Sequence, residues 1–239
     1  EVMTLEMRAS GDEAPVIQNP LSQEHSRLRD ALLPALLAEV EVNWAAHGRD
    51  VQLFEVGRVF RSKGPAARPH EELRAGFVIT GGRHPAHWTD TAAAPFDLWD
   101  ARWRFERLVA LADSTAVVQV EQQRWVARDP AGLVIGWCGE LDADAPAWAE
   151  AVFGGEMRVS LDAAPTRERF VALPAHPAVT RDLALLLGAA QPVAAVLDLL
   201  SVRGARHGVE SVDVVSEYRG AGVPDGQRSV AIRLVYRAG

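Results

Sequence analysis

The pattern of apolar and polar positions divides the start of the chain into strand-like and helix-like segments. Residues 1–8 alternate between apolar and polar side chains, and residues 50–61 are rich in Val, Phe and Leu, so both segments predict strands. Between them, residues 33–48 have helical spacing. Pro34 suits the first turn of a helix, where a missing N–H is not needed. We therefore predict a strand, a helix that begins near Leu33, and a second strand.

The pattern after residue 61 predicts a loop, a strand and a second helix. Residues 62–72 contain Gly and Pro and predict the loop, whereas residues 73–82 form an apolar run that ends in a Gly pair and predict a strand. Residues 96–99, "FDLW", predict a short strand that runs into a helix. The helix follows from apolar residues that recur at helical spacing between Phe105 and Ala112.

The rest of the first region predicts more strand structure. Residues 124–141 are two apolar segments around a Pro-Ala-Gly turn, which is typical of a hairpin. A short helix over about 145–152 and a strand over 156–162 are predicted to follow. Trp99 and Trp103 lie at helical spacing, and we interpret them as core residues rather than as a platform for stacking bases.

A break in the pattern indicates a domain boundary. Residues 163–178 contain three prolines and show no periodicity. The segments beyond it predict the order strand, helix, strand, turn, strand, over 181–187, 192–204, 209–220, 221–227 and 228–237. A β-α-β-β order is the first two-thirds of a ferredoxin-like unit, an arrangement that also underlies a common RNA-binding architecture.

Length and composition are those of a soluble globular protein that can bury one large core or two modest ones. The chain has 239 residues, of which 48% are hydrophobic and 24% charged. We expect domains over residues 1–165 and 171–239. No apolar run of about 18 residues and no signal-peptide order is present, so we expect no membrane insertion and a cytoplasmic location. Cys138 is the only cysteine, which excludes an internal disulfide and a zinc site built from paired cysteines.

The net charge of −7 argues against a protein that holds nucleic acid by bulk electrostatics. The charge is unevenly distributed, because the segment from Val171 to the end has seven arginines against six acidic residues. Lys63 is the only lysine. We interpret the use of Arg in place of Lys as a bias of the coding sequence rather than as a requirement of a site.

Motifs for catalysis and metal binding are scarce. The sequence contains neither GxxxxGK[ST] nor GxGxxG, and no GxSxG motif. His84, His87 and Asp90 lie three residues apart, but Pro85 favours a loop, so a polar surface turn is preferred over a metal site. Cys138 lies in an apolar segment and is interpreted as a buried, inert thiol. We predict no catalytic residue and no metal ligand.

Two stretches resemble a known family. The run "NPLSQEHSRLRDALLPALL" (19–37), followed by "VQLFEVGRVF" (51–60), resembles the catalytic-like module of the bacterial phenylalanyl-tRNA synthetase β subunit. The segments "PAHPAVTRDLALLL" (174–187) and "VESVDVVSEYRGAGVPDGQRSVAIRLVY" (209–236) resemble the anticodon-binding domain that ends that subunit. The resemblance implies an α+β protein, with a class II synthetase-like antiparallel sheet and flanking helices followed by a truncated ferredoxin-like (RRM-like) βαββ domain that lacks its last helix and strand.

The resemblance also implies a function. In that family an α2β2 enzyme uses ATP and magnesium to join phenylalanine to its tRNA, and the chemistry belongs to the α subunit. This chain is then expected to be a C-terminal fragment of the β subunit that binds no cofactor itself. Its expected partners are the α subunit and tRNA(Phe), and no association with a membrane is expected.

The residues support a module without catalytic activity. A class II active site needs an Arg on one strand, an acidic residue on the returning strand, and a Gly-rich strand that ends in a second Arg. Arg58 and Arg61 could form the first arm. However, the sequence has no FxQxE-like return and no GxGxxR, and Arg29, Asp30 and Ala31 stand where the family usually has Arg-Thr-Ser.

The resemblance implies two sets of candidate residues. Contacts to RNA would come from arginines through phosphate pairing and base stacking, and the candidates are Arg181, Arg203, Arg206, Arg219 and Arg228. A core or subunit interface would be built around the helix that starts near Leu33, from Leu28, Leu32, Leu33, Pro34, Leu36, Val40 and Trp44, with Leu37 on the same face.

Three alternatives remain open. Each candidate arginine could be a solvated surface residue in an Arg-biased chain. The chain could also be a free-standing RNA-binding or adaptor protein that is built from the same two modules and has no synthetase partner. A self-sufficient class II enzyme would catalyse ATP-pyrophosphate exchange that depends on Arg58, and we expect no such activity.

Overall fold

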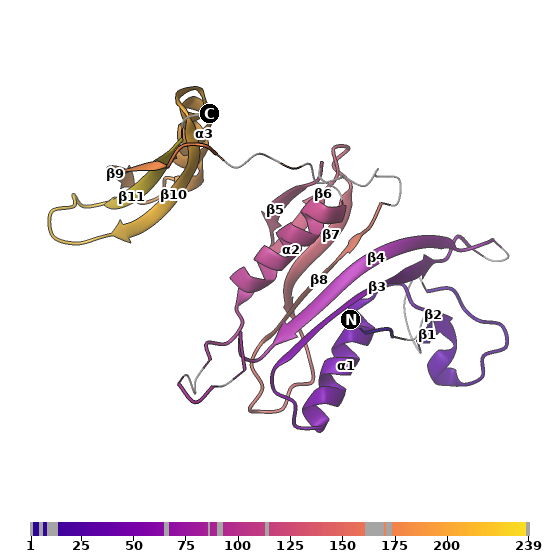
Figure 1. Cartoon of the computed structure of the whole chain (residues 1–239). Helices are drawn as coiled ribbons and strands as arrows, with labels where there is room; N and C mark the ends of the chain where they lie inside the picture. The colour runs from indigo at the N-terminus through magenta and orange to yellow at the C-terminus, as the bar shows by residue number, and fades with distance from the viewer. Residues whose placement is uncertain are drawn as a thin grey trace. The chain divides into compact units, whose positions relative to one another are not determined.

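The computed structural model describes residues 2–4, 7–8, 14–64, 67–85, 87–89, 93–112, 115–160, 170 and 174–237. The chain divides into two compact units, Glu1–Pro165 and Thr166–Gly239, which are described separately. Both are α+β, as the sequence predicts (Figure 1). Among the described residues, no helix is long and apolar enough to cross a lipid bilayer.

A six-stranded antiparallel sheet forms the centre of the first unit. Its strand order is β3-β4-β8-β7-β6-β5. The strands are β3 (Val51–Arg61), β4 (His70–Thr80), β8 (Val152–Arg158), β7 (Val134–Leu141), β6 (Arg124–Arg128) and β5 (Val117–Glu121). The predicted antiparallel sheet with flanking helices is confirmed.

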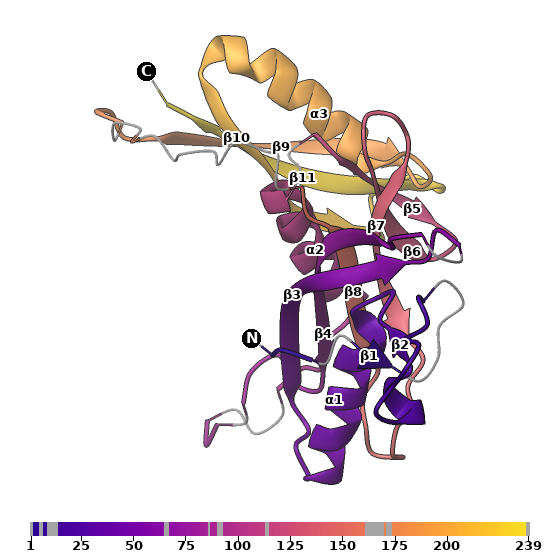
Figure 2. The same ribbon diagram turned by 90° about the vertical axis from the view of Figure 1, so that its right-hand side faces the viewer.

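The two α-helices among the described residues of this unit lie on opposite faces of the sheet, α1 (Leu33–Ala45) on one and α2 (Leu98–Ala112) on the other (Figures 1 and 2). Strand β4 shows this arrangement most directly. Val78 packs in the cluster that contains the α1 residues, whereas its neighbours Phe77 and Ile79 pack in the cluster that contains the α2 residues. Since successive side chains of a strand point to opposite faces, this part of the sheet has an apolar core on each side.

The helix that begins at Leu33 agrees with the sequence, but the strand expected over residues 1–8 is much shorter than predicted. Within the described residues of that segment, only β1 (Met7–Arg8) is strand, and it pairs with β2 (Arg27–Leu28). A 3-10 turn, η1 (Gln23–His25), precedes β2. The segment also contacts the edge strand of the six-stranded sheet, because the Val2 N–H donates to the carbonyl of Phe54 in β3 at 3.0 Å.

Two further predictions are wrong. Residues 96–99 form no strand, because Asp97 caps the helix that starts at Leu98. Residues 145–152 form no helix, and β8 starts at Val152 because this residue pairs with Leu141 in the sheet. In both places a tertiary or capping interaction overrides a local pattern.

Strand β5 was not predicted. It forms a hairpin with β6 in which Glu121 pairs with Arg124, so only Gln122 and Gln123 form the turn. Both have positive φ angles, 47° and 67°, as a type I′ turn requires. Glutamine is not a usual residue for this turn, so the residue types do not indicate a turn here.

Trp99 and Trp103 do not belong to the core, which corrects their interpretation as core residues. Their side chains are 65% and 61% exposed, whereas Ala101 and Phe105 on the same helix are buried. Both residues lie in α2 at helical spacing, but they are not on the side of the helix that is buried.

The second unit is a three-stranded antiparallel sheet with a single helix among its described residues. Its strand order is β10-β11-β9. The elements are β9 (Val179–Gly188), α3 (Val193–Gly204), the 3-10 turn η2 (Ala205–His207), β10 (Val209–Tyr218) and β11 (Gln227–Tyr236). The predicted β-α-β-β order is confirmed. Helix α3 packs Val196, Leu197 and Leu200 against Val230 and Ile232 of the sheet.

Candidate functional sites

A buried arginine links β3 to the segment that precedes α1. Arg29, which is 2% exposed, donates through Nη1 to Glu55 Oε1 at 2.8 Å and through Nε to the Arg58 carbonyl at 2.7 Å. Thr4 completes the group, because its hydroxyl accepts from Arg29 and donates to Glu55 Oε2 at 2.6 Å. Gly57 makes room for the guanidinium, since a Cβ at this position would overlap it.

A second buried charge stabilises the start of α1. Glu156 of β8 is 1% exposed, and its Oε2 accepts the backbone N–H groups of Leu32 and Leu33 at 2.8 and 3.0 Å. Its Oε1 pairs with Arg74, which also donates to Glu72 Oε1 at 2.6 Å. Burial alone would lower the pKa of Arg74, but the charges and hydrogen bonds of Glu156 and Glu72 raise it above its ordinary value. Glu156 thus performs the task of an N-cap from another element.

In these two clusters the buried ionic groups form ion pairs with one another. Arg29 is neutralised by Glu55, and Arg74 by Glu72 and Glu156. On the surface, Arg58 pairs with Glu71 at 3.2 Å. Such an arrangement fixes α1 to the sheet, and each charged group in it already has an ion-pair partner within the unit.

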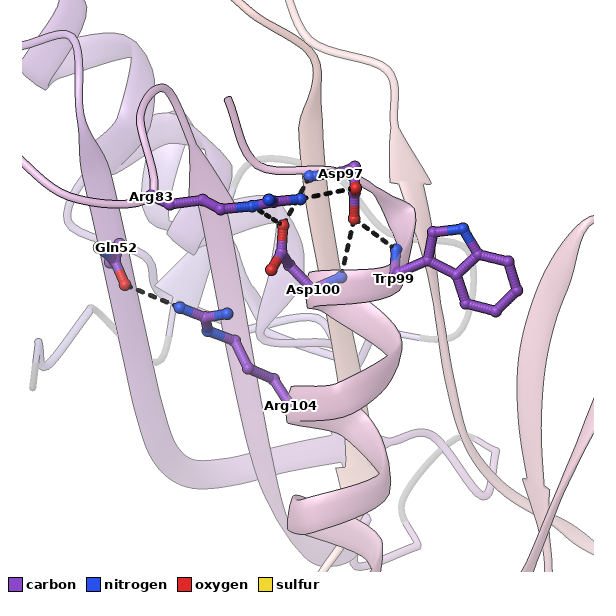
Figure 3. A network of polar contacts seen from close by, with 6 residues as sticks. All are labelled: Gln52, Arg83, Asp97, Trp99, Asp100 and Arg104. Atoms are coloured by element: carbon purple, nitrogen blue, oxygen red, sulfur yellow. Dashed lines mark hydrogen bonds and ion pairs between the residues drawn. The ribbon is translucent and has the colours of Figure 1, made fainter. Parts of the chain in front are cut away.

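The start of α2 carries a third polar network (Figure 3). Asp97 Oδ1 accepts the N–H groups of Trp99 and Asp100 at 2.9 and 3.0 Å, while Asp100 Oδ2 accepts the N–H of Asp97 at 2.9 Å. Arg83 bridges both carboxylates, at 2.7 and 2.8 Å. Burial acts to raise the pKa of Asp100, but the Asp97 N–H and Arg83 outweigh it and lower that pKa below its usual range.

This lowered pKa gives a pH dependence. A carboxylate with a lowered folded-state pKa stabilises the fold above its ordinary pKa of about 4, and that contribution is lost as the pH falls through the folded-state value. We expect Asp100→Asn to reduce the loss of stability on acidification below about pH 4. Urea unfolding of the variant and the parent chain across a pH series checks this. An unchanged pH profile would contradict the assignment, and Asp144→Asn, at an exposed loop position, is the control.

The candidates for a core or subunit interface are mostly buried inside the first unit. Buried side chains are those of Leu32, Leu33, Leu36, Val40 and Trp44, which form one cluster with β3, β4 and β8. Leu28 and Leu37 are half-buried, and Pro34 is exposed. Side chains that are covered by the chain's own sheet leave little area for a partner.

The groups considered for metal binding and thiol chemistry are placed as follows. His84 Nδ1 lies 3.3 Å from the Pro85 carbonyl, His87 Nδ1 lies 2.9 Å from the Thr89 hydroxyl, and Asp90 is outside the described residues. Across the part of the chain that is described, His, Cys, Asp and Glu side chains form no group of three suited to a metal. Cys138 is buried, and burial raises the pKa of its thiol to about 12.

Several arginines of the second unit are held by acidic residues. Arg219 and Arg228 both pair with Glu217, at 2.8 and 2.9 Å, and Arg228 also donates to the Gln191 carbonyl. Similarly, Arg233 pairs with Asp182 and Arg237 pairs with Glu210. Two of the five candidates for RNA contact, Arg219 and Arg228, therefore belong to ion pairs within the unit.

The other three candidates lie near the opposite end of the same sheet. Arg181 is near the start of β9 and donates to the carbonyl of its neighbour Thr180. Arg203 lies in the last turn of α3, and Arg206 lies in η2, shortly before β10. The starts of β9 and β10 meet the end of β11, so all three lie near one end of the sheet. Arg203 and Arg206 are exposed and form no ion pair with any residue that the structure describes.

Comparison with known protein families assigns both units. The family "Phenylalanyl tRNA synthetase beta chain CLM domain" matches residues 3–147, and the family "Ferredoxin-fold anticodon binding domain" matches residues 174–239. The chain belongs to the phenylalanyl-tRNA synthetase β-chain CLM domain family. The first unit is therefore called the CLM domain below, and the second the anticodon-binding domain.

Proteins that are similar to this CLM domain protein over more than 90% of its length are β subunits of phenylalanine-tRNA ligase. That of Moorella thermoacetica is 33% identical over 235 residues, with 92% of this chain and 29% of the relative covered. Those of a Synechococcus strain and of Novosphingobium aromaticivorans are 31% and 30% identical, with 93% and 95% of this chain and 29% and 30% of the relatives covered. The chain thus spans less than a third of the length of these relatives.

A solved structure of Giardia lamblia prolyl-tRNA synthetase in complex with prolyl-adenylate is similar over 61% of this chain and 35% of that one. Its TM-score is 0.39 and its identity 8%, so the likeness is too distant to support an argument.

Sequence reasoning missed the buried ionic clusters of the CLM domain. Glu156 lies in the apolar strand "VFGGEMRV". A carboxylate in such a strand indicates a buried charge that needs a partner, and this was the signal that could have revealed the cluster. Its partner Arg74 lies 82 residues earlier in the chain, and only the register of β4 and β8 brings the two side chains together.

Proposed function

We propose that the chain works as part of the β subunit of phenylalanine-tRNA ligase, in which its anticodon-binding domain contacts tRNA(Phe) through the arginine-rich end of the sheet. The observation that carries this proposal is the exposure of Arg203 and Arg206 without an acidic partner among the described residues. Cations of this kind can pair with RNA phosphates and stack on unpaired bases without first breaking an internal ion pair. Arg181 lies near the same end and is the third candidate.

The CLM domain is proposed to support the α subunit in an α2β2 assembly in the cytoplasm and not to catalyse. Its buried carboxylates and guanidinium groups form ion pairs with one another, and Arg58 pairs with Glu71, which supports a structural module. In this proposal ATP and magnesium are used by the assembled enzyme, with the chemistry in the α subunit.

Substitution of the unpaired arginines tests the RNA contact. We expect the double variant Arg203→Ala and Arg206→Ala to weaken binding of a tRNA(Phe) transcript. The slope of log K against log salt should become shallower by up to about two, because each phosphate contact contributes about 0.7 to 0.9. Fluorescence anisotropy over a salt series measures both quantities.

The matched control is Arg219→Ala, which removes an exposed arginine already paired with Glu217. It should change the salt slope by much less than one. An unchanged slope in the double variant, or an equal change in the control, would rule out the proposed end of the sheet as the phosphate-binding site. Co-purification with an α subunit tests the assembly, and its failure together with intact tRNA binding would favour a free-standing RNA-binding protein.

A further inference from the structure

The face of the CLM sheet that carries α2 is only partly covered. Helix α2 packs over β7 and β8, whereas α1 lies on the opposite face of the sheet. On this side Phe77 and Ile79 of β4 are buried in the cluster that contains the α2 residues, whereas Phe54 and Val56 of the edge strand β3 are half-exposed. A groove of about 440 Å³ runs there between the two strands and α2.

The walls of this groove are apolar and exposed. From β3, Phe54 and Val56 are 49% and 50% exposed, and from α2, Trp103 and Leu111 are 61% and 83% exposed. A cluster of four large apolar side chains at this level of exposure is typical of an interaction surface. Isolated apolar residues on a surface need no such explanation, but these four line one groove.

The uncovered strip follows β3, the edge strand of the sheet. An α-helix with its side chains is about 10 to 12 Å across, whereas neighbouring strands lie about 4.8 Å apart. A further helix beside α2 would therefore cover β3 and extend past the edge of the sheet.

The charge of the groove indicates which charge a bound helix would carry. Arg104 and Arg107 line it from α2 at helical spacing. Arg104 points towards β3 and donates to Gln52 at 3.0 Å (Figure 3), whereas Arg107 is exposed and forms no ion pair with the described residues. The carboxylate of Glu55, a lining residue, is held by Arg29. The groove is therefore positively charged along its α2 wall.

We propose that this groove docks an amphipathic helix of a partner protein, with acidic residues on the edge that faces α2. The helix buries its apolar stripe on Phe54, Val56, Trp103 and Leu111, and its carboxylates pair with Arg107 and Arg104. A second copy of this chain fits less well, because α2 set against α2 would bring like charges together. The proposal goes beyond the RNA contact and does not depend on it.

Two designed helical peptides of about 18 residues, roughly 27 Å long, test the proposal with the full chain. They share one leucine stripe and differ only in having Glu or Lys along its edge. Fluorescence anisotropy should show binding of the Glu peptide and at least tenfold weaker binding of the Lys peptide. Trp103→Glu and Leu111→Glu should each lower the affinity for the Glu peptide by about tenfold or more. Arg107→Glu should reduce or reverse the preference for the Glu peptide over the Lys peptide.

The controls separate the groove from other surfaces. Val42→Glu, at a position of α1 that is 62% exposed on the opposite side of the sheet, should leave peptide binding unchanged. The double variant Arg203→Ala and Arg206→Ala should also leave it unchanged, so a failure of tRNA binding and a failure of this proposal are distinguishable. Equal binding of both peptides, or no effect of Trp103→Glu, would overturn the proposal. Concentration-dependent self-association of the chain that Leu111→Glu abolishes would instead assign the groove to a second copy.

Discussion

Replacing Glu156 with alanine should lower the free energy of unfolding of the CLM domain by about 3–5 kcal/mol. The carboxylate is almost fully buried, it accepts the first two N–H groups at the start of α1, and it neutralises the mostly buried guanidinium of Arg74. Its removal leaves two unpaired backbone donors inside the protein and takes from Arg74 the more deeply buried of its two carboxylate partners, and breaking a buried ion pair in this way is costly. Urea unfolding followed by circular dichroism measures the change.

A matched control uses a carboxylate at the surface. Glu71 pairs with Arg58, but the two side chains are 37% and 64% exposed. Glu71→Ala should therefore cost less than about 1 kcal/mol. Glu156→Gln, which retains an acceptor oxygen without the charge, should fall between the two alanine variants. If Glu156→Ala lowered the free energy of unfolding by no more than Glu71→Ala does, the cluster would not be what holds α1 on the sheet.

The second large effect is expected for Leu36→Ala in α1. Leu36 is fully buried against β4 and β8, so truncation should leave a cavity and cost about 2–5 kcal/mol in the isolated chain. Val42→Ala, at an exposed position of the same helix, should cost less than about 1 kcal/mol. The pair of variants separates two roles, because a residue that served mainly a subunit interface would lose partner binding while the free chain stayed stable. Little change in stability for Leu36→Ala would favour the interface.

Local chemistry allowed much of the secondary structure to be predicted. Pro34 marked the start of α1, because a proline is accepted only in the first turn of a regular helix. The β-hairpin of β6 and β7 and the β-α-β-β order of the anticodon-binding domain followed from apolar runs separated by Gly and Pro. In these segments the local pattern and the tertiary structure agree.

The failures arose where a distant or unusual interaction decides the conformation. The turn at Gln122 and Gln123 lacks the expected Asn or Gly, so β5 went unrecognised. The exposure of Trp99 and Trp103 could not be predicted from helical spacing alone, since spacing does not say which side of a helix meets the sheet. Among the candidate arginines, sequence could not separate Arg219, which is held by Glu217, from Arg203, because that pairing depends on side-chain positions.

The burial of Cys138 makes the protein convenient for site-specific labelling. With a thiol pKa of about 12, only about one thiol in 10⁵ is ionised at pH 7, and thiolate is the form that reacts with maleimides. A cysteine introduced on the surface should therefore react alone, without removal of the native one. A single fluorophore beside Arg206 would then report on RNA, and one beside Leu111 on a helical partner, each without background labelling at Cys138.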